Sequence, residues 1–365
     1  MSPKKYLRYF VPANMFGTSR TKDIVQMYPS FPTTREEADK VKICIYDYDA
    51  ATLQETELHS VEEAKAYKDN HHTTWINLDG LRKKEVEQIS EYFDIHPLLT
   101  EDILSINQRP KLDEMDNLIY CLLYMLYYND TTQTVEHEQI SIVMGKGYVI
   151  TFQEFPKKDV FNPLRDKLKM ANSTLRQRGA DYLCYSMLDM IVDNYFVVME
   201  KLGERIEALE EDIINNSNSQ SLALISQLRK EMIVLKRNIT PVRDLISSLM
   251  RSDSPLLDKR TIKYFKDIYD HIIQAYDLSE NYRDLMMNMH DLYINSVNLK
   301  MNESMKVMAV VTCLLAPATV IGGIFGMNFQ RIPLLHNRWG FYISVALMLL
   351  IPIWMLRVFK RKGWF

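Results

Sequence analysis

The chain has 365 residues, of which 47% are apolar and 25% charged, and its formal net charge is -3. This is the composition of a folded protein of two or three domains, and it excludes disorder as the overall state. A charge so close to zero also argues against a dedicated nucleic-acid-binding protein, which usually carries a clear excess of Lys and Arg.

Residues 1–155 are expected to form a cytosolic α/β domain. Segments rich in Ile, Val, Tyr and Phe predict strands at 41–48, 73–79, 117–128 and 139–154. The last segment contains Gly145-Lys146-Gly147 between two β-like runs, which indicates a hairpin turn. Helical spacing of the apolar residues, with many good helix formers, predicts helices at 61–70 and 81–93.

Residues 156–254 are expected to form a long antiparallel helical hairpin. Gly and Pro are sparse here, and helical patterns run through 181–216 and 221–250 on either side of the polar stretch NNSNSQS. Two amphipathic helices packed side by side are a common way to bury their apolar faces. The acidic residues near the tip of this hairpin are interpreted as a solvated face.

Residues 255–330 are expected to form a third helix, because a helical pattern begins after SDSP and meets no breaker before Pro317. About 60 helical residues would rise on the order of 90 Å. Such a helix would leave the soluble part of the protein and enter the membrane without interruption, which would couple the two mechanically.

The C-terminal part of the chain is predicted to cross a membrane twice. The stretches 307–330 and 339–356 contain no Asp, Glu, Lys or Arg, and about 20 apolar residues suffice to cross the hydrocarbon core. The alternative is that both stretches are buried helices of a soluble protein. The occurrence of two such stretches in succession argues against it. Residues 331–338 are then the loop between the spans, and 339–365 are the second span with a basic tail.

The positive charges predict the orientation of this hairpin. Basic residues gather after the second span and before the first, whereas the connecting loop carries only Arg331, Arg338 and His336. This distribution places both termini in the cytoplasm. The four cysteines form no CxxC pair, so neither a disulfide framework nor a zinc ribbon is expected, and the chain suits a reducing compartment.

Polar and small residues repeat along the third helix at alternating steps of four and three, the spacing of a coiled-coil seam. They are Asp291, Asn295, Asn298, Asn302, Met305, Ala309, Thr312, Ala316 and Thr319. A ring of identical helices with this seam inward would enclose a wet, weakly polar axial path. Met308, one step from the seam, would supply an apolar constriction that gates by dewetting. The alternative is a face of small residues at which helices pack closely.

The first span ends in Gly326-Met327-Asn328 after a helix that contains Pro317 and many small residues. This triplet resembles the GMN signature of the CorA family of divalent-cation transporters, which carry magnesium and cobalt. The resemblance covers most of the chain. It includes IHPLLTEDIL (95–104), QRPK (108–111), ADYLCYSMLDMIVDNYF (180–196), YFKDIYDHIIQ (264–274), NESMKVM (302–308) and the basic KRKGWF tail.

The resemblance implies an α+β membrane protein of the bacterial inner membrane. It would assemble with itself as a homopentameric funnel, in which five third helices line one pore and the second spans form an outer ring. Gly326, Met327 and Asn328 would be the selectivity filter at the periplasmic mouth. Mg²⁺ releases its bound waters reluctantly, so amide oxygens that bind those waters can select the ion without removing them. The residues expected to line or gate the pore are Asp291, Asn298, Asn302, Met305, Met308, Thr312, Ala316 and Thr319.

The resemblance also implies a regulatory metal site between cytosolic domains. Asp267 would face a neighbouring subunit, and its partners would be Asp102, Glu101 and Asp189; without the resemblance these are scattered surface charges. A bound divalent cation turns the repulsion of apposed carboxylates into a bridge. High internal Mg²⁺ would thus keep the pore shut. Mg²⁺ is then both cargo and regulator, with no organic cofactor, and the membrane potential drives its entry.

Other functions stay open at this point. The loop after the triplet, FQRIPLLHNRWG, contains no acidic residue to attract cations, which leaves the choice among Mg²⁺, Co²⁺, Ni²⁺ and Zn²⁺ unsettled. A proton-coupled Zn²⁺ transporter of the same superfamily is the alternative. An enzyme is not expected, because the histidines are scattered and no HExxH motif or phosphate-binding loop occurs. A helical scaffold anchored by the hairpin would leave the polar seam unexplained.

Overall fold

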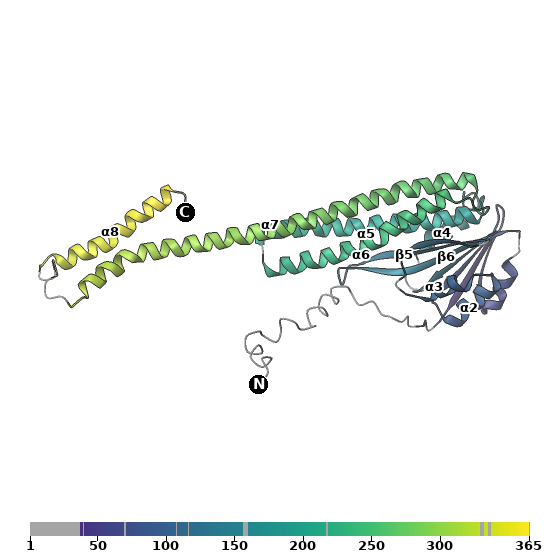
Figure 1. The fold of residues 1–365 in the computed structure, drawn as a ribbon, viewed down its shortest axis with the longest axis horizontal. Helices are drawn as coiled ribbons and strands as arrows, with labels where there is room; N and C mark the ends of the chain where they lie inside the picture. Colours follow the sequence, from purple (N-terminus) through teal and green to yellow (C-terminus); the bar gives the residue numbers. More distant parts are fainter. Residues whose placement is uncertain are drawn as a thin grey trace, which may run out of the picture. The chain divides into compact units, whose positions relative to one another are not determined.

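The computed structural model describes residues 37–38, 40–68, 71–106, 108–115, 117–155, 160–216, 218–328, 332–334 and 337–364. They form two compact units, and three long helices contribute to both (Figure 1). The first unit contains the described chain up to Leu202 together with Glu231–Glu280. The second contains Gly203–Lys230 and the chain from Asn281 onwards.

The first unit is built on a seven-stranded sheet with the order β2-β1-β3-β7-β6-β5-β4. Strands β3 and β7 pair in parallel, and every other neighbouring pair is antiparallel. The strands are β1 (Lys42–Tyr48), β2 (Leu53–Leu58), β3 (Thr73–Asp79), β4 (Lys111–Met115), β5 (Leu118–Asn129), β6 (Thr134–Gly145) and β7 (Tyr148–Gln153).

The predicted strands are confirmed, and the hairpin turn falls at Lys146-Gly147 between β6 and β7. Gly147 has φ +83°, a left-handed backbone conformation that glycine adopts without steric cost. The edge strands β2 and β4 were not predicted. Their sequences, LQETEL and KLDEM, are too charged to look like strands, and each lies at an edge of the sheet where one side faces solvent.

Helices cover both faces of the sheet, which explains why β5 is buried along nine consecutive residues. On one face lie η3 (Val61–Tyr67), α2 (Lys83–Tyr92) and α3 (Pro97–Leu104), and Gln139 Nε2 on β6 donates to Asp102 O of α3 at 3.2 Å. On the other face lies α5 (Ala180–Asn216), as Figure 1 shows, and its Tyr195 Oη donates to Tyr124 O of β5 at 2.8 Å. The short helix α4 (Asn162–Lys169) follows the sheet in sequence.

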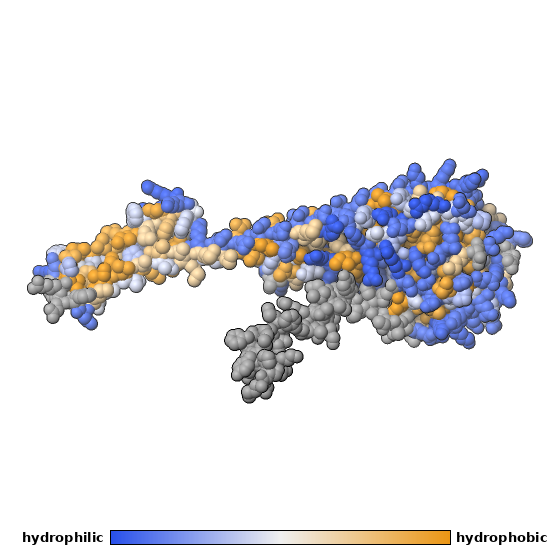
Figure 2. Space-filling view, in the orientation of Figure 1, coloured by the Kyte–Doolittle hydropathy of each residue, from blue (hydrophilic) through white to orange (hydrophobic). Residues whose placement is uncertain are grey.

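Four helices complete the chain: α5 (Ala180–Asn216), α6 (Ser219–Arg251), α7 (Lys259–Phe325) and α8 (Gly340–Arg361). Helices α5 and α6 occupy the stretch for which the sequence predicts a helical hairpin, and the long third helix is confirmed. Helix α7 has 67 residues and continues through Pro317. Helices α7 and α8 each contain a window long and apolar enough to cross a membrane, with 6% of it buried. Figure 2 shows the apolar surface over α8 and the neighbouring end of α7.

A buried carboxyl in the sheet makes the stability of the first unit depend on pH. Glu138 on β6 is 1% exposed, and it accepts hydrogen bonds from Tyr127 Oη and Phe155 N, both at 2.8 Å. Burial, with a smaller contribution from the charge of nearby Glu154, raises the pKa of Glu138 to about 7, and the hydrogen bonds that it accepts oppose the shift. The folded protein therefore holds this proton at pH values where the unfolded chain has released it.

This shift predicts that Glu138→Gln stabilises the protein above neutral pH. The contribution of Glu138 to stability is fully present below its unfolded pKa and is lost as pH rises through about 7, a change of about 3 kcal/mol. Thermal unfolding of the solubilised protein should show a higher midpoint for the variant at about pH 8 and little difference at about pH 5. The control is Glu57→Gln, an exposed carboxylate on β2. Equal midpoints at both pH values would contradict the assignment.

Candidate functional site

The polar seam lies on one exposed face of α7 in the second unit. All eight residues predicted to line the pore are exposed in the single chain, and Met305 and Met308 are 53% and 72% exposed. Their spacing keeps them on one side of a helix with 3.6 residues per turn. They are Asp291, Asn298, Asn302, Met305, Met308, Thr312, Ala316 and Thr319.

Helix α8 packs against the other side of α7. Val310 is 4% exposed, Leu314, Pro317 and Ile321 are half-buried, and this stripe lies opposite the seam around the helix. A side chain added at Gly322 would come within 3.9 Å of Met348 Cε on α8. The seam is therefore not the face with which the two apolar helices of one chain pack, and it is left open for another contact.

Within the apolar stretch, the seam's hydroxyls donate to their own helix. Thr312 Oγ1 donates to Met308 O at 2.8 Å, and Thr319 Oγ1 donates to Leu315 O at 3.1 Å. A hydroxyl that donates in this way keeps its oxygen lone pairs free to accept. Both threonines are exposed, so the seam presents acceptor oxygens beside the small residues Ala309 and Ala316. Such a surface suits water and hydrated cations.

The triplet Gly326-Met327-Asn328 directly follows Phe325, the last residue of α7. Gly326 N donates to Gly322 O at 3.0 Å and Met327 N to Ile324 O at 3.3 Å, so the last turn tightens before the exposed Asn328. A Cβ on Gly326 would lie 3.2 Å from Gly322 O, a close contact that favours glycine here. Arg331 and His336 of the predicted loop lie outside the described residues.

The predicted metal ligand Asp102 is already paired within its own chain. Its Oδ2 lies 2.5 Å from Lys111 Nζ, and the same Nζ lies 2.8 Å from Asp113 Oδ2. The side chain of Asp102 is 15% exposed. The carboxylate of Asp102 is thus paired with a positive charge of its own chain. Lys111, which supplies that charge, is also paired with Asp113.

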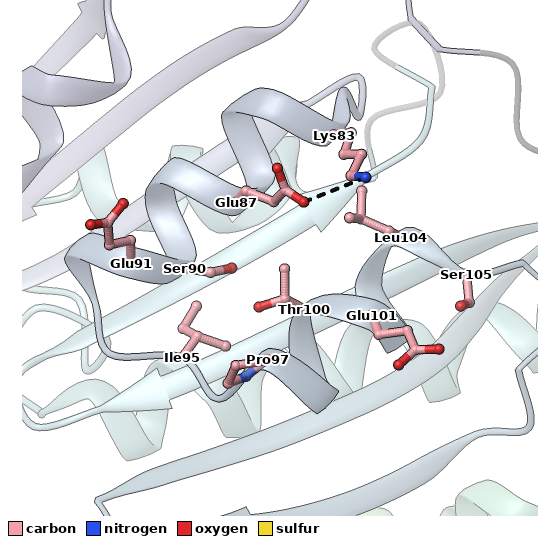
Figure 3. Close-up of a pocket in the computed structure, with 10 residues that line it drawn as sticks. All are labelled: Lys83, Glu87, Ser90, Glu91, Ile95, Pro97, Thr100, Glu101, Leu104 and Ser105. Carbon is pink, nitrogen blue, oxygen red and sulfur yellow. Dashed lines mark ion pairs between the residues drawn. The ribbon is translucent and has the colours of Figure 1, made fainter.

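Glu101, the next residue, lines a pocket of about 680 Å³ between α2 and α3. In Figure 3 its carboxylate lies apart from Glu87 and Glu91, which come from α2, and Glu87 pairs with Lys83 at 3.8 Å. The acidic side chains around this pocket do not converge on one point. The pocket therefore offers no ready set of metal ligands within one chain.

A second cluster of acidic side chains, together with a histidine, lies between α5 and α7 in the first unit. One ligand atom from each of Asp189, Asp193 and His271 lies within 4.8 Å of the other two. Burial raises the pKa of Asp189; Asp193 and Asp267 raise it further, and His271 opposes the shift. The structure thus places the predicted Asp189 and Asp267 near each other, whereas Asp102 and Glu101 lie on α3.

Asp193 and His271 were missed in the sequence. Each follows a predicted ligand by four residues, Asp189 and Asp267 respectively, and side chains four apart lie on the same face of a helix. That spacing was the signal that could have revealed them. It required knowing that the two helices lie side by side.

The family model described as "CorA-like Mg2+ transporter protein" matches residues 70–361. The "Cobalt/magnesium transport protein CorA" of Thermotoga maritima is 37% identical over 332 residues, which are 91% of this chain and 94% of that protein. The "Zinc transport protein ZntB" of Yersinia pseudotuberculosis is 21% identical over 301 residues, 80% of this chain and 87% of that one.

The fold also matches a solved structure. "The complete structure of CorA magnesium transporter from Methanocaldococcus jannaschii" aligns with a TM-score of 0.72 at 23% identity, and the alignment covers 90% of this chain and 100% of that one. The two chains share an N-terminal α/β domain, a long helix and two C-terminal apolar helices.

Proposed function

The chain belongs to the family of CorA-like Mg²⁺ transporter proteins, and on that premise we propose that it is a channel for Mg²⁺, with Co²⁺ and Ni²⁺ as further cargo. The observation that carries the proposal is the exposed seam of α7, which faces away from α8 and leads to the Gly326-Met327-Asn328 triplet. A scaffold needs no such surface. An ion path needs one from each subunit.

Five copies of the chain would form the pore, with every seam turned toward the common axis and every α8 on the outside. In this arrangement the acceptor oxygens of Thr312 and Thr319 would face a water-filled lumen, and the apolar surface of α8 would face lipid. Met308, exposed beside the seam, would form the apolar constriction. Both termini would lie in the cytoplasm, in the orientation that the basic residues favour.

The filter would act on a hydrated ion. Mg²⁺ releases its waters reluctantly, and the amide oxygens of an Asn328 ring can accept hydrogen bonds from those waters without stripping them. The membrane potential would drive entry, because two charges falling through roughly 100 mV release about 4.6 kcal/mol. Uptake then needs no nucleotide.

Internal Mg²⁺ would close the pore by binding between subunits. Asp267 is exposed on α7, as a residue that meets a neighbouring chain must be, and its proposed partners are Asp102, Glu101 and Asp189. Lys111 can remain neutralised by Asp113 while Asp102 turns to the metal. Loss of the ion would release the subunits and open the pore, a negative feedback by population shift.

Mg²⁺ entry into liposomes that contain the purified protein and a Mg²⁺-sensitive dye tests this proposal. We expect entry that grows with an inside-negative potential and stops when Mg²⁺ is loaded inside beforehand. The control is the same liposomes without protein. An intact protein that admits no Mg²⁺ at any potential, with internal Mg²⁺ low, would overturn the proposal.

Proton-coupled Zn²⁺ transport is the second candidate, favoured only by the absence of acidic residues from the described part of the loop and by the more distant zinc relative. A pH-sensitive dye in the same liposomes separates the two. Zn²⁺ entry accompanied by internal acidification would favour the second candidate. Mg²⁺ entry without a pH change would favour the channel.

A further inference from the structure

We infer that the pocket between α2 and α3 is a binding site for an aliphatic polyamine, an organic cation whose amines are spaced along a hydrocarbon stem. The pocket has a volume of about 680 Å³, which lies within the range of pockets that hold small ligands. Both helices belong to the first unit, so one chain supplies the whole site. The inference goes beyond the proposed function, because it needs neither the pore nor a contact between subunits.

The rim of the pocket is acidic. Glu87 and Glu91 on α2 and Glu101 on α3 are exposed, and Lys83 is the one basic residue among those described around the pocket. Lys83 and Glu87 lie 3.8 Å apart with side chains that are 69% and 53% exposed, and such a pair contributes little in water. Three carboxylates against one ammonium give the rim an excess of negative charge, which attracts cations and repels anions.

The spacing of the carboxylates suits an organic cation better than a metal ion. In Figure 3 the carboxylates of Glu87 and Glu91 stand apart along α2, and that of Glu101 lies across the pocket on α3. A metal ion needs oxygen atoms that meet at one point, roughly 2.0–2.6 Å from its centre. A polyamine carries its charges several bonds apart, so each ammonium group can meet a different carboxylate.

Apolar side chains lie between these carboxylates. Ile95 is 5% exposed, Leu104 is half-buried, and Pro97 begins α3 beside them. The methylene groups of a polyamine would leave water against these side chains, which is favourable in proportion to the apolar area covered. A simple ammonium ion or a hydrated metal ion gains nothing from such a surface.

A buried hydroxyl in the pocket independently points to a missing ligand. Ser90 is 4% exposed, and its Oγ has no hydrogen-bond partner among the described residues. In Figure 3 this hydroxyl points across the space between the helices toward Thr100, whose own Oγ1 donates to His96 O at 3.4 Å. A buried polar atom without a partner costs free energy. An ammonium group of the ligand would donate to the Ser90 oxygen and remove that cost.

Calorimetric titration of the full-length solubilised protein with spermidine tests the site. We expect one spermidine per chain at low salt and neutral pH. Ser90→Ala should weaken binding by about tenfold or more, the usual effect of losing a hydrogen bond to a charged group. This variant should fold, because it removes a buried polar atom without a partner and alanine is a better helix former than serine.

The acidic rim is tested by combining Glu87→Gln with Glu91→Gln, and Glu101 stays unchanged because it is shared with the proposed magnesium bridge. The combined variant should bind spermidine more weakly and with less dependence on salt. The matched control is Glu62→Gln, an exposed carboxylate on η3, which should bind like the wild type. Ammonium chloride, which carries the charge without the stem, should give no saturable heat at the same concentration.

Thermal unfolding gives a second readout. Spermidine should raise the midpoint of the wild type and of Glu62→Gln equally, and should raise that of Ser90→Ala less. Equal spermidine affinity for wild type and Ser90→Ala would overturn the inference, and so would a wild-type midpoint that spermidine leaves unchanged. Because neither readout measures ion flux, the site can fail while the channel stands, and the channel can fail while the site stands.

Discussion

Replacing Asn328 by alanine is expected to abolish Mg²⁺ entry into liposomes, down to the rate of liposomes without protein. Asn328 is exposed directly after the last turn of α7, and a methyl group offers no acceptor to the waters of a hydrated ion. The helix itself should survive, because the side chain lies beyond its last residue, Phe325. The measurement is the initial rate of the dye signal at fixed potential.

Asn337→Ala provides the matched control for this experiment. Asn337 lies in the connection to α8, where its Oδ1 accepts a hydrogen bond from Trp339 N at 2.9 Å. Its loss removes this local turn hydrogen bond before α8 and leaves the triplet untouched. We expect entry close to that of the wild type. Undiminished entry through Asn328→Ala, with the variant reconstituted in equal amount, would place the filter elsewhere.

The second large effect is expected from the cytosolic carboxylates. Asp267→Ala should leave Mg²⁺ entry running at internal Mg²⁺ concentrations that stop entry through the wild-type protein, because the proposed bridge between subunits loses a ligand. Asp102→Ala should act in the same direction. The measurement is the initial rate of entry as a function of Mg²⁺ loaded inside the liposomes.

Asp270→Ala serves as the control for these variants. Asp270 is an exposed aspartate on α7, three residues after Asp267, and so matches it in charge and in helix. We expect Asp270→Ala to close at the wild-type concentration. If Asp267→Ala and Asp102→Ala close there too, the channel is regulated by other residues.

Much of the fold could be predicted because local sequence patterns identify most of its strands and helices. Strands β1, β3, β5, β6 and β7 are runs of β-branched and aromatic residues buried on both faces, and α7 has a regular pattern. The edge strands β2 and β4 carry charge on their solvent side, so no local pattern distinguishes them from loops. These two segments are strands because they pair with the neighbouring strands β1 and β5.

The candidate site divides in the same way. The seam lies on one helix, so its period alone places the residues on a common face, but only the packing of α8 shows that this face stays open. The group of Asp189, Asp193 and His271 unites two helices that are distant in sequence, and no periodicity within either helix pairs them. Lys111 beside Asp102 was equally hidden, since β4 was not foreseen.

That lysine has a consequence for the working range of the proposed sensor. An ion that binds Asp102 must first displace a positive charge already held there, so the observed affinity is the intrinsic affinity reduced by the stability of the Lys111 pair. The lysine acts as a built-in competitor. Substitutions at Lys111 or Asp113, neither of which is proposed to bind metal, could therefore raise or lower the threshold of closure during evolution. A lineage could match its set point to the free Mg²⁺ of its own cytoplasm and leave the ligands unchanged.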